Sequence, residues 1–165
     1  MSLARILRHL VSSRFSVRRA FPSEALEAIE RTIRETEATH EGEIVLVVES
    51  ALETLPLLRG QTARERALEV FSRMRVWDTE HNNGVLIYIL MADRAVEIIA
   101  DRGIHVRTGE KAWKEVCREM EAAFRRGDYL PGALAGIRAV GRHLASHYGS
   151  AATRKNELPD KPVVS

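Results

Sequence analysis

Two apolar segments separated by only two residues constrain the fold more than any other feature of this sequence. Residues 85–92 form an uninterrupted apolar run, and residues 95–101 follow after Asp93 and Arg94 alone. A two-residue connection is long enough for a hairpin but too short for a crossover, so the two segments are predicted to be antiparallel strands. The core must therefore form around a sheet that contains this hairpin.

A third strand is predicted at residues 43–49, which are β-branched and apolar through their middle. The apolar residues Ala67, Val70, Phe71 and Met74 recur at helical spacing between this strand and the hairpin, and they predict a helix within residues 61–76. A helical crossover between neighbouring strands implies that the strands are parallel. Strands that are apolar throughout are buried on both faces, so helices are expected on both sides of the sheet.

Further helical stripes are predicted from Ser23 to about Thr39, after a cap at Thr108, and after the break at Gly127 and Asp128. This order of elements predicts an α/β fold, a three-layer α/β/α sandwich around a small mixed sheet with a β-hairpin. We expect a basic amphipathic segment at residues 1–21, one α/β domain at residues 22–148 and a disordered tail at residues 149–165. The tail carries prolines and charges but no apolar period.

The net charge of +2 conceals a division of charge along the chain. Residues 1–22 contain five arginines and no Asp or Glu, whereas residues 23–148 contain 17 basic and 21 acidic residues. An acidic domain with 5% aromatic residues argues against nucleic-acid binding, which needs a basic face and stacking side chains. The single cysteine, Cys117, excludes an intrachain disulfide, and its place in an apolar helical stripe favours a buried thiol over a nucleophile.

The first residues form an amphipathic pattern. On a helix, Leu3, Ile6, Leu7 and Leu10 share one face, and Arg5 and Arg8 lie outside it. Three interpretations remain open: the apolar face packs on the protein itself or on a second copy, it inserts into an anionic membrane surface with the arginines at the head groups, or the segment is a targeting sequence.

Two features of the sequence bear on where the chain is located. The arginines interrupt the apolar core that a secretory signal needs, and the longest apolar run, eight residues, is shorter than the roughly 20 residues of a membrane span. We therefore expect a cytoplasmic protein that is peripheral to the membrane.

Polar side chains gather at one edge of the predicted sheet, where the first two strands start and the third ends. Their carboxylate and amide oxygens are ligands that Ca²⁺ or Mg²⁺ accepts. The predicted metal ligands are Asp78, Glu80, Asn82, Asn83 and Asp101. Further binding residues expected at the same edge are Glu43, His81, Arg102 and His105. The alternative is structural: Asp78 or Thr79 caps a turn, and residues 82–84 supply a positive φ.

Residues 76–88 (VWDTEHNNGVLIY), the Ala92-Asp93-Arg94 turn and residues 96–104 (VEIIADRGI) resemble the TPM-domain family, over about residues 21–148. The family takes its name from a thylakoid-lumen protein, a photosystem II repair protein and a nematode receptor accessory protein. The chain is most similar to a bacterial branch without signal peptide or membrane anchor. The resemblance implies an α/β/α sandwich, and it implies functions found in the family: Ca²⁺ binding, acid phosphatase activity or service as an accessory factor of a membrane complex.

Two functional hypotheses follow. The first is a non-enzymatic TPM-like module that binds a divalent cation and acts as an accessory or assembly factor near the cytoplasmic membrane, with a membrane-complex protein as partner. The alternative is a metal-assisted phosphatase, in which a cation held by Asp78 and Asp101 polarises a phosphoryl oxygen and Arg102 or His81 stabilises the developing charge. The sequence identifies no catalytic nucleophile.

Overall fold

The computed structural model describes residues 3–12, 14–149 and 156–165. The strands are β1 (Glu43–Glu49), β2 (Gly84–Leu90), β3 (Ala95–Ala100) and β4 (Val163–Val164). The helices are α1 (Leu3–Val11), α2 (Arg14–Ala20), α3 (Ser23–Glu37), α4 (Thr54–Leu58), α5 (Ala63–Arg73), α6 (Arg102–Thr108), α7 (Glu110–Arg125) and α8 (Tyr129–Tyr148).

The described strands form one mixed sheet in the order β3-β2-β1-β4. β1 and β2 are parallel, with Glu43 opposite Gly84, and β2 and β3 form the antiparallel hairpin, with Val85 opposite Ala100. Both strand directions were predicted from the sequence and are confirmed. They follow from the lengths of the connections, because α5 fits between β1 and β2 and only a turn fits between β2 and β3.

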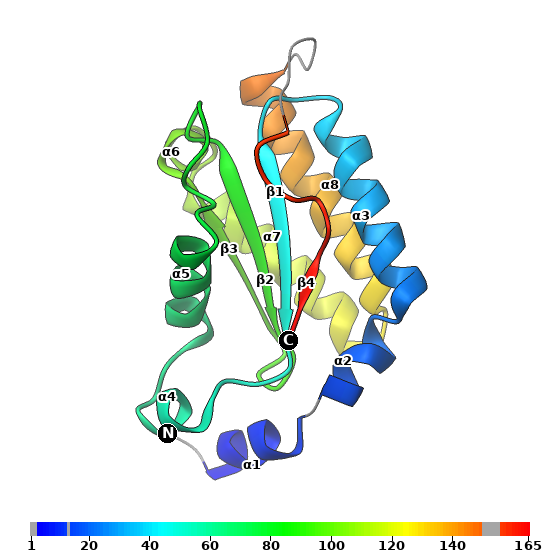
Figure 1. Cartoon of the computed structure of the whole chain (residues 1–165), viewed down its shortest axis with the longest axis vertical. Helices are drawn as coiled ribbons and strands as arrows, with labels where there is room; N and C mark the ends of the chain where they lie inside the picture. Colours follow the sequence, from blue (N-terminus) through cyan, green and yellow to red (C-terminus); the bar gives the residue numbers. More distant parts are fainter. Residues whose placement is uncertain (1–2, 13, 150–155) are drawn as a thin grey trace.

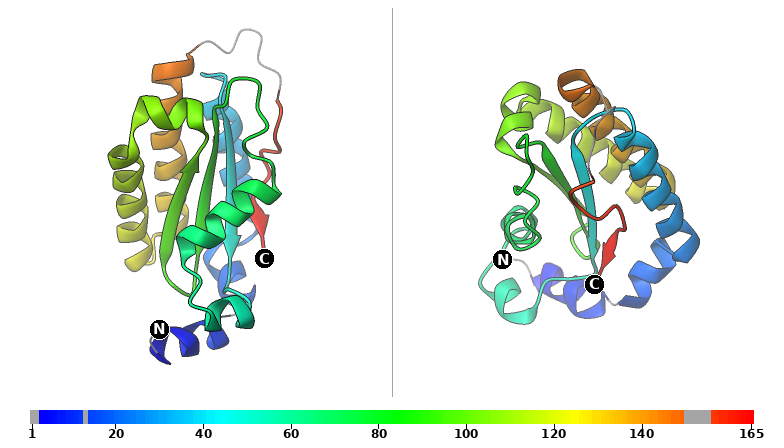
Figure 2. Two further views of the ribbon diagram at one scale, coloured as in Figure 1. Left: turned by 90° about the vertical axis from the view of Figure 1, so that its left-hand side faces the viewer. Right: turned by 45° about the horizontal axis from the view of Figure 1, so that its top comes forward.

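Helices cover both faces of the sheet, as the apolar strands require (Figures 1 and 2). Alternate side chains of β1 point to opposite layers. Ile44, Leu46 and Val48 belong to the core beneath α3, α7 and α8. Val45 and Val47 join the smaller core beneath α4 and α5. The predicted three-layer α/β/α sandwich is therefore confirmed.

The C-terminal segment differs from the prediction. Val163 and Val164 pair with Val47 and Val48 of β1 in parallel, so this segment extends the sheet. Backbone hydrogen bonds join Ser165 to Val48 and to Ser50, at 3.0 and 2.8 Å. The prediction of disorder is wrong for residues 156–165; residues 150–155 lie outside the described part of the chain. A two-residue strand has no period of its own, and the unpaired edge of β1 provides its partner.

The residues after β3 also differ from the prediction. They form the short helix α6, with Asp101 at its N-cap. Thr108, the predicted cap of the next helix, is the last residue of α6, and Gly109 with φ of 84° precedes α7. The apolar stripe of α7 was identified from the sequence, but the helix itself begins two residues after the predicted cap, Thr108. The chain turns sharply between α6 and α7 at a glycine in the left-handed region.

Candidate functional site

Three segments meet at one end of the sheet, where β1 and β2 begin and β3 ends. The backbone N–H of Asp101 donates to the carbonyl of Gly84 at 2.8 Å, and Glu43 is the β1 partner of Gly84. We call this end, with Glu43, Asn83 and Asp101, the polar end. The predicted strand directions place these three segments at the same end of the sheet.

Two buried oxygens at the polar end have no hydrogen-bond partner among the described residues, Asn83 Oδ1 and Asp101 Oδ2. The Asn83 side chain is 0% exposed, and its Nδ2 donates to the Glu41 carbonyl at 3.1 Å. Asp101 is 9% exposed, and its Oδ1 accepts from the Arg102 backbone at 2.6 Å. Burial raises the pKa of the Asp101 carboxyl above its ordinary value. The structure therefore leaves two buried acceptors on neighbouring strand ends.

Glu43 has a different role at the same end. Its two carboxylate oxygens accept the backbone N–H groups of Glu157 and Leu158, at 3.2 Å each. These bonds hold the segment that leads into β4. The Glu43 side chain is fully buried and contributes to the attachment of the C-terminal segment.

Asp78 and Glu80 lie on the surface. Asp78 pairs with Arg75 at 2.7 Å, and the backbone N–H of Glu80 donates to the Glu157 carboxylate at 3.2 Å. Within residues 3–12, 14–149 and 156–165, no group of three or more His, Cys, Asp or Glu side chains is arranged to hold a metal ion. Of the five predicted metal ligands, only Asn83 and Asp101 present buried, unpartnered side-chain oxygens.

The residues before β2 also show the two features of the structural alternative, a turn capped by a side chain and a positive φ. Asn82 has φ of 52°, and the Thr79 hydroxyl accepts the backbone N–H of Asn83 at 3.1 Å. The carbonyl of Asn82 faces Gly103, where an added Cβ would come within 2.6 Å of it. Glycine is therefore required where α6 meets this turn.

The other predicted binding residues are dispersed. His81 Nε2 lies 3.5 Å from Glu41 Oε2 on the surface, and the side chain of Arg102 is exposed. His105 lies on α6 and lines a separate cavity of about 270 Å³. None of the other predicted binding or metal-ligating residues is among the described residues that line this cavity.

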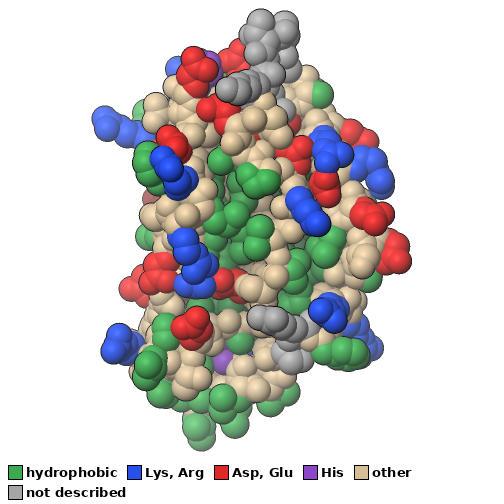
Figure 3. All heavy atoms as spheres, in the orientation of Figure 1, with side chains coloured by type: hydrophobic (Ala, Val, Ile, Leu, Met, Phe, Trp, Pro, Cys, Tyr) green, Lys and Arg blue, Asp and Glu red, His purple; other side chains and the backbone are tan. Residues whose placement is uncertain are grey.

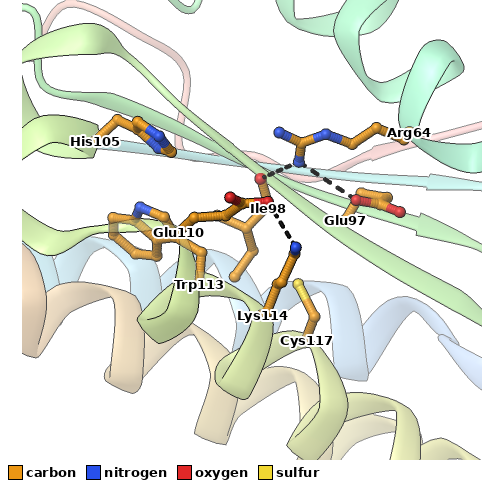
Figure 4. Close-up of a pocket in the computed structure, with 8 residues that line it drawn as sticks. All are labelled: Arg64, Glu97, Ile98, His105, Glu110, Trp113, Lys114 and Cys117. Atoms are coloured by element: carbon orange, nitrogen blue, oxygen red, sulfur yellow. Dashed lines mark hydrogen bonds and ion pairs between the residues drawn. The ribbon is translucent and has the colours of Figure 1, made fainter.

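That cavity is formed by α5, β3, α6 and α7 (Figure 4). Arg64 Nη1 donates to the Ile98 carbonyl at 2.9 Å, and Lys114 pairs with Glu110 at 2.6 Å. The buried indole N–H of Trp113 has no hydrogen-bond partner among the described residues. Sequence reasoning missed this cavity because its lining comes from elements far apart in the chain, with no local motif.

Cys117 also lines the cavity. Burial, with a smaller contribution from nearby Glu97, raises the pKa of its thiol to about 12. A raised pKa favours the neutral thiol over the thiolate needed for nucleophilic attack. The Cys117 side chain itself is half-buried.

Helix α1 has the two predicted faces, but its basic face lies against the domain and its apolar face is exposed. The guanidinium of Arg5 pairs with Asp93 at 2.7 Å, and Arg8 Nε donates to the Ala92 carbonyl at 3.2 Å, so both arginines contact the domain. Leu3, Leu7 and Leu10 are exposed, and Ile6 is half-buried. The expectation that Arg5 faces lipid is wrong for this arrangement, and so is the alternative that the apolar stripe packs on its own domain.

Comparison with known proteins agrees with the fold. The model of the TPM domain matches residues 18–143, which is most of the chain. The chain belongs to the TPM-domain family. No curated protein sequence matches this TPM domain significantly.

The solved structures that are similar to this TPM domain include two determined by NMR. The NMR structure of the BA42 protein from the psychrophilic bacterium Bizionia argentinensis superposes with a TM-score of 0.77 at 27% identity, and the match covers 88% of this chain and 95% of that chain. The N-terminal domain of a protein from P. gingivalis gives a TM-score of 0.63 at 19% identity, over 79% of this chain and 82% of that chain. Because its sequence identity is so low, the second similarity shows a shared fold and nothing more.

Proposed function

We propose that this TPM domain is a non-enzymatic accessory module that binds a hard divalent cation at the polar end. The observation that supports the proposal is the pair of buried, unpartnered oxygens, Asn83 Oδ1 and Asp101 Oδ2. Leaving a buried acceptor without a partner costs about 1–3 kcal/mol. A cation bound to these oxygens would replace the missing partners and would favour the charged form of Asp101.

The donor set favours Ca²⁺ over Mg²⁺. Asp101 supplies a carboxylate oxygen and Asn83 an amide oxygen, and the remaining ligands would be backbone carbonyls or water. Ca²⁺ tolerates such irregular oxygen sites, whereas Mg²⁺ demands near-octahedral geometry. Affinity for Ca²⁺ rises with the number of charged ligands, so a site with one carboxylate is expected to bind weakly, with Kd of about 0.1–1 mM.

The same geometry favours a binding role over the phosphatase alternative. That mechanism requires Asp78 and Asp101 to share one cation. Asp78 instead pairs with Arg75 on the surface, whereas Asp101 is buried. None of the described helices is long and apolar enough to cross a membrane.

Titration of the ¹⁵N-labelled protein with Ca²⁺, and separately with Mg²⁺, tests the proposal. Chemical-shift changes are expected to be largest in residues 82–84 and 101–104 and stronger with Ca²⁺. Asp101→Asn retains an oxygen for the Arg102 N–H but removes the charge, so this variant is expected to lose the response. Asp78→Asn is the matched control and is expected to respond like the natural chain, because its side chain lies in the surface pair with Arg75.

Two results would contradict the proposal. Shifts scattered over the surface, or shifts of unchanged size in Asp101→Asn, would remove the site from the polar end. Hydrolysis of a chromogenic phosphoester that depends on both Asp78 and Asp101 would favour the phosphatase instead.

A further inference from the structure

Helix α1 is attached to the domain by its polar face, at the end of the sheet opposite the polar end (Figure 1). Arg5 donates to both Asp93 carboxylate oxygens, at 2.7 to 3.1 Å, and also to the Gln61 carbonyl at 2.7 Å. His9 Nε2 lies 3.0 Å from Asp93 Oδ1. Asp93 in the hairpin turn is therefore the main attachment point of α1.

Further hydrogen bonds set the rotation of α1 about its axis. His9 Nδ1 accepts the backbone N–H of Leu52 at 3.0 Å, so the proton is on Nε2, which donates to Asp93. Just after the helix, the Ser12 hydroxyl donates to the Ser50 carbonyl at 2.8 Å. Because the polar face is held by these bonds, turning the leucines inward would break them.

The apolar face of α1 consequently faces outward. We call its four exposed side chains the α1 patch: Leu3, Leu7, Leu10 and Val11, with exposed fractions of 72%, 54%, 64% and 79%. Two further exposed leucines, Leu55 and Leu58, belong to α4, which lies beside α1 in Figures 1 and 2. Figure 3 shows hydrophobic side chains gathered at this end of the molecule.

The charged side chains that line the groove beside the α1 patch are basic. A groove of about 460 Å³ next to the patch is lined by the apolar residues Leu7, Val11 and Met91 and by Arg8 and Arg94. No Asp or Glu is among the lining residues in the part of the chain that the structure describes. Residues 1–22 as a whole contain five arginines and no acid. An apolar surface with a basic border is complementary to an anionic lipid surface.

We propose that the α1 patch docks on an anionic membrane surface. The leucines enter the interface between head groups and acyl chains, and Arg94 contacts the lipid phosphates. Arg8 lies beside it, half-exposed, with its Nη2 3.7 Å from Asp93 Oδ1. Arg5 and His9 stay on Asp93 and hold α1 in the orientation that exposes the patch. The proposal is independent of the cation site, which lies at the other end of the sheet.

Co-sedimentation of the full chain with vesicles tests this proposal. The vesicles are phosphatidylcholine alone, or phosphatidylcholine and phosphatidylglycerol at about 3:1, so that the second kind has the negative surface potential that attracts basic residues. Binding is expected to be strong only with the anionic vesicles. Combining Leu7→Gln with Leu10→Gln is expected to lower the partition coefficient at least about tenfold, because two inserted apolar side chains are lost.

A second variant tests the charge. Arg94→Asn is expected to weaken binding to anionic vesicles about fivefold, because one cation near the surface is lost. Asn tolerates the left-handed backbone of this position, where φ is 52°. The matched control is Val106→Gln, an exposed apolar residue on α6 at the other end of the sheet, which is expected to bind like the natural chain.

Three results would overturn the proposal: equal partitioning of the natural chain to neutral and anionic vesicles, undiminished binding of the double leucine variant, or a dimer in sedimentation equilibrium that the double variant converts to monomer without any vesicle binding. The last result would assign the patch to contact between two copies. Asp101→Asn is expected to keep full vesicle binding, so failure of the cation proposal is distinguishable from failure of this one.

Discussion

Two aspartates flank β3: Asp93 precedes the strand in the hairpin turn, and Asp101 follows it at the polar end. Burial by itself raises the pKa of the Asp93 carboxyl, but the hydrogen bonds from Arg5 and His9 outweigh burial and lower it below its ordinary value. For Asp101, burial dominates and raises the pKa, since the bond from the Arg102 backbone is too weak to offset it. The same residue type is thus stabilised as an anion at one end of β3 and destabilised at the other.

Glu49 extends the comparison, because it lies at the same end of the sheet as Asp93. Its buried carboxylate accepts from Arg66 at 2.7 Å and from the Tyr88 hydroxyl at 2.6 Å. Burial raises the pKa of Glu49, but these partners lower it overall. Buried carboxylates with cationic partners hold elements together, and Asp101, whose Oδ2 has no partner among the described residues, is the one left for a ligand.

The largest effect is expected when Glu49 is replaced by alanine. Removing one partner of a buried ion pair leaves the Tyr88 hydroxyl without its acceptor and Arg66 without its buried counter-charge, so Glu49→Ala is expected to lower the free energy of unfolding by about 3 kcal/mol. Urea denaturation measures the change. Glu69→Ala is the matched control, because exposed Glu69 also pairs with Arg66, at 3.0 Å. Its effect is expected to be below about 1 kcal/mol, and equal losses in the two variants would contradict the comparison.

An intermediate, pH-dependent effect is expected for Asp93→Asn. At pH 6 the variant is expected to be less stable than the natural chain by about 2 kcal/mol, because the charge-assisted hydrogen bonds that Asp93 accepts from Arg5 and His9 are weakened. A carboxyl whose pKa is lowered by folding stabilises the protein above its unfolded value of about 3.9, and this stabilisation is lost as the pH falls through the folded value. Urea denaturation between pH 6 and pH 2 should show the difference shrinking towards zero, and a difference independent of pH would contradict this.

The smallest effect, of opposite sign, is expected for Asp101→Asn. A carboxyl whose pKa is raised by folding opposes folding once the pH rises through the folded value, so its neutral replacement removes that cost. In buffer without divalent cations at pH 7, the variant is expected to be more stable than the natural chain by less than about 1 kcal/mol. The gain should vanish below about pH 4, where both side chains are neutral. A loss of stability at pH 7 would show that Asp101 has a charged partner.

The polar end was predictable because it depends only on strand directions. The two-residue connection at Asp93 and Arg94 and the helical crossover before β2 set those directions, and they bring the start of β2, after Asn83, and the end of β3, before Asp101, to the same end of the sheet. Which of the five predicted ligands keeps an oxygen without a partner was not predictable. Asp78 is paired with Arg75 on the surface, and Glu43 binds backbone N–H groups more than 100 residues away.

The sequence by itself determined the layers, the mixed sheet and the hairpin, because apolar periodicity and connection length act locally along the chain. Only the tertiary structure decided the orientation of α1, the pairing of β4 and the cavity that Trp113 lines. An amphipathic pattern does not say which face points inward. For α1 the choice was made by Asp93, a carboxylate 88 residues from Arg5 in sequence, which binds the helix's basic face and leaves its leucines exposed.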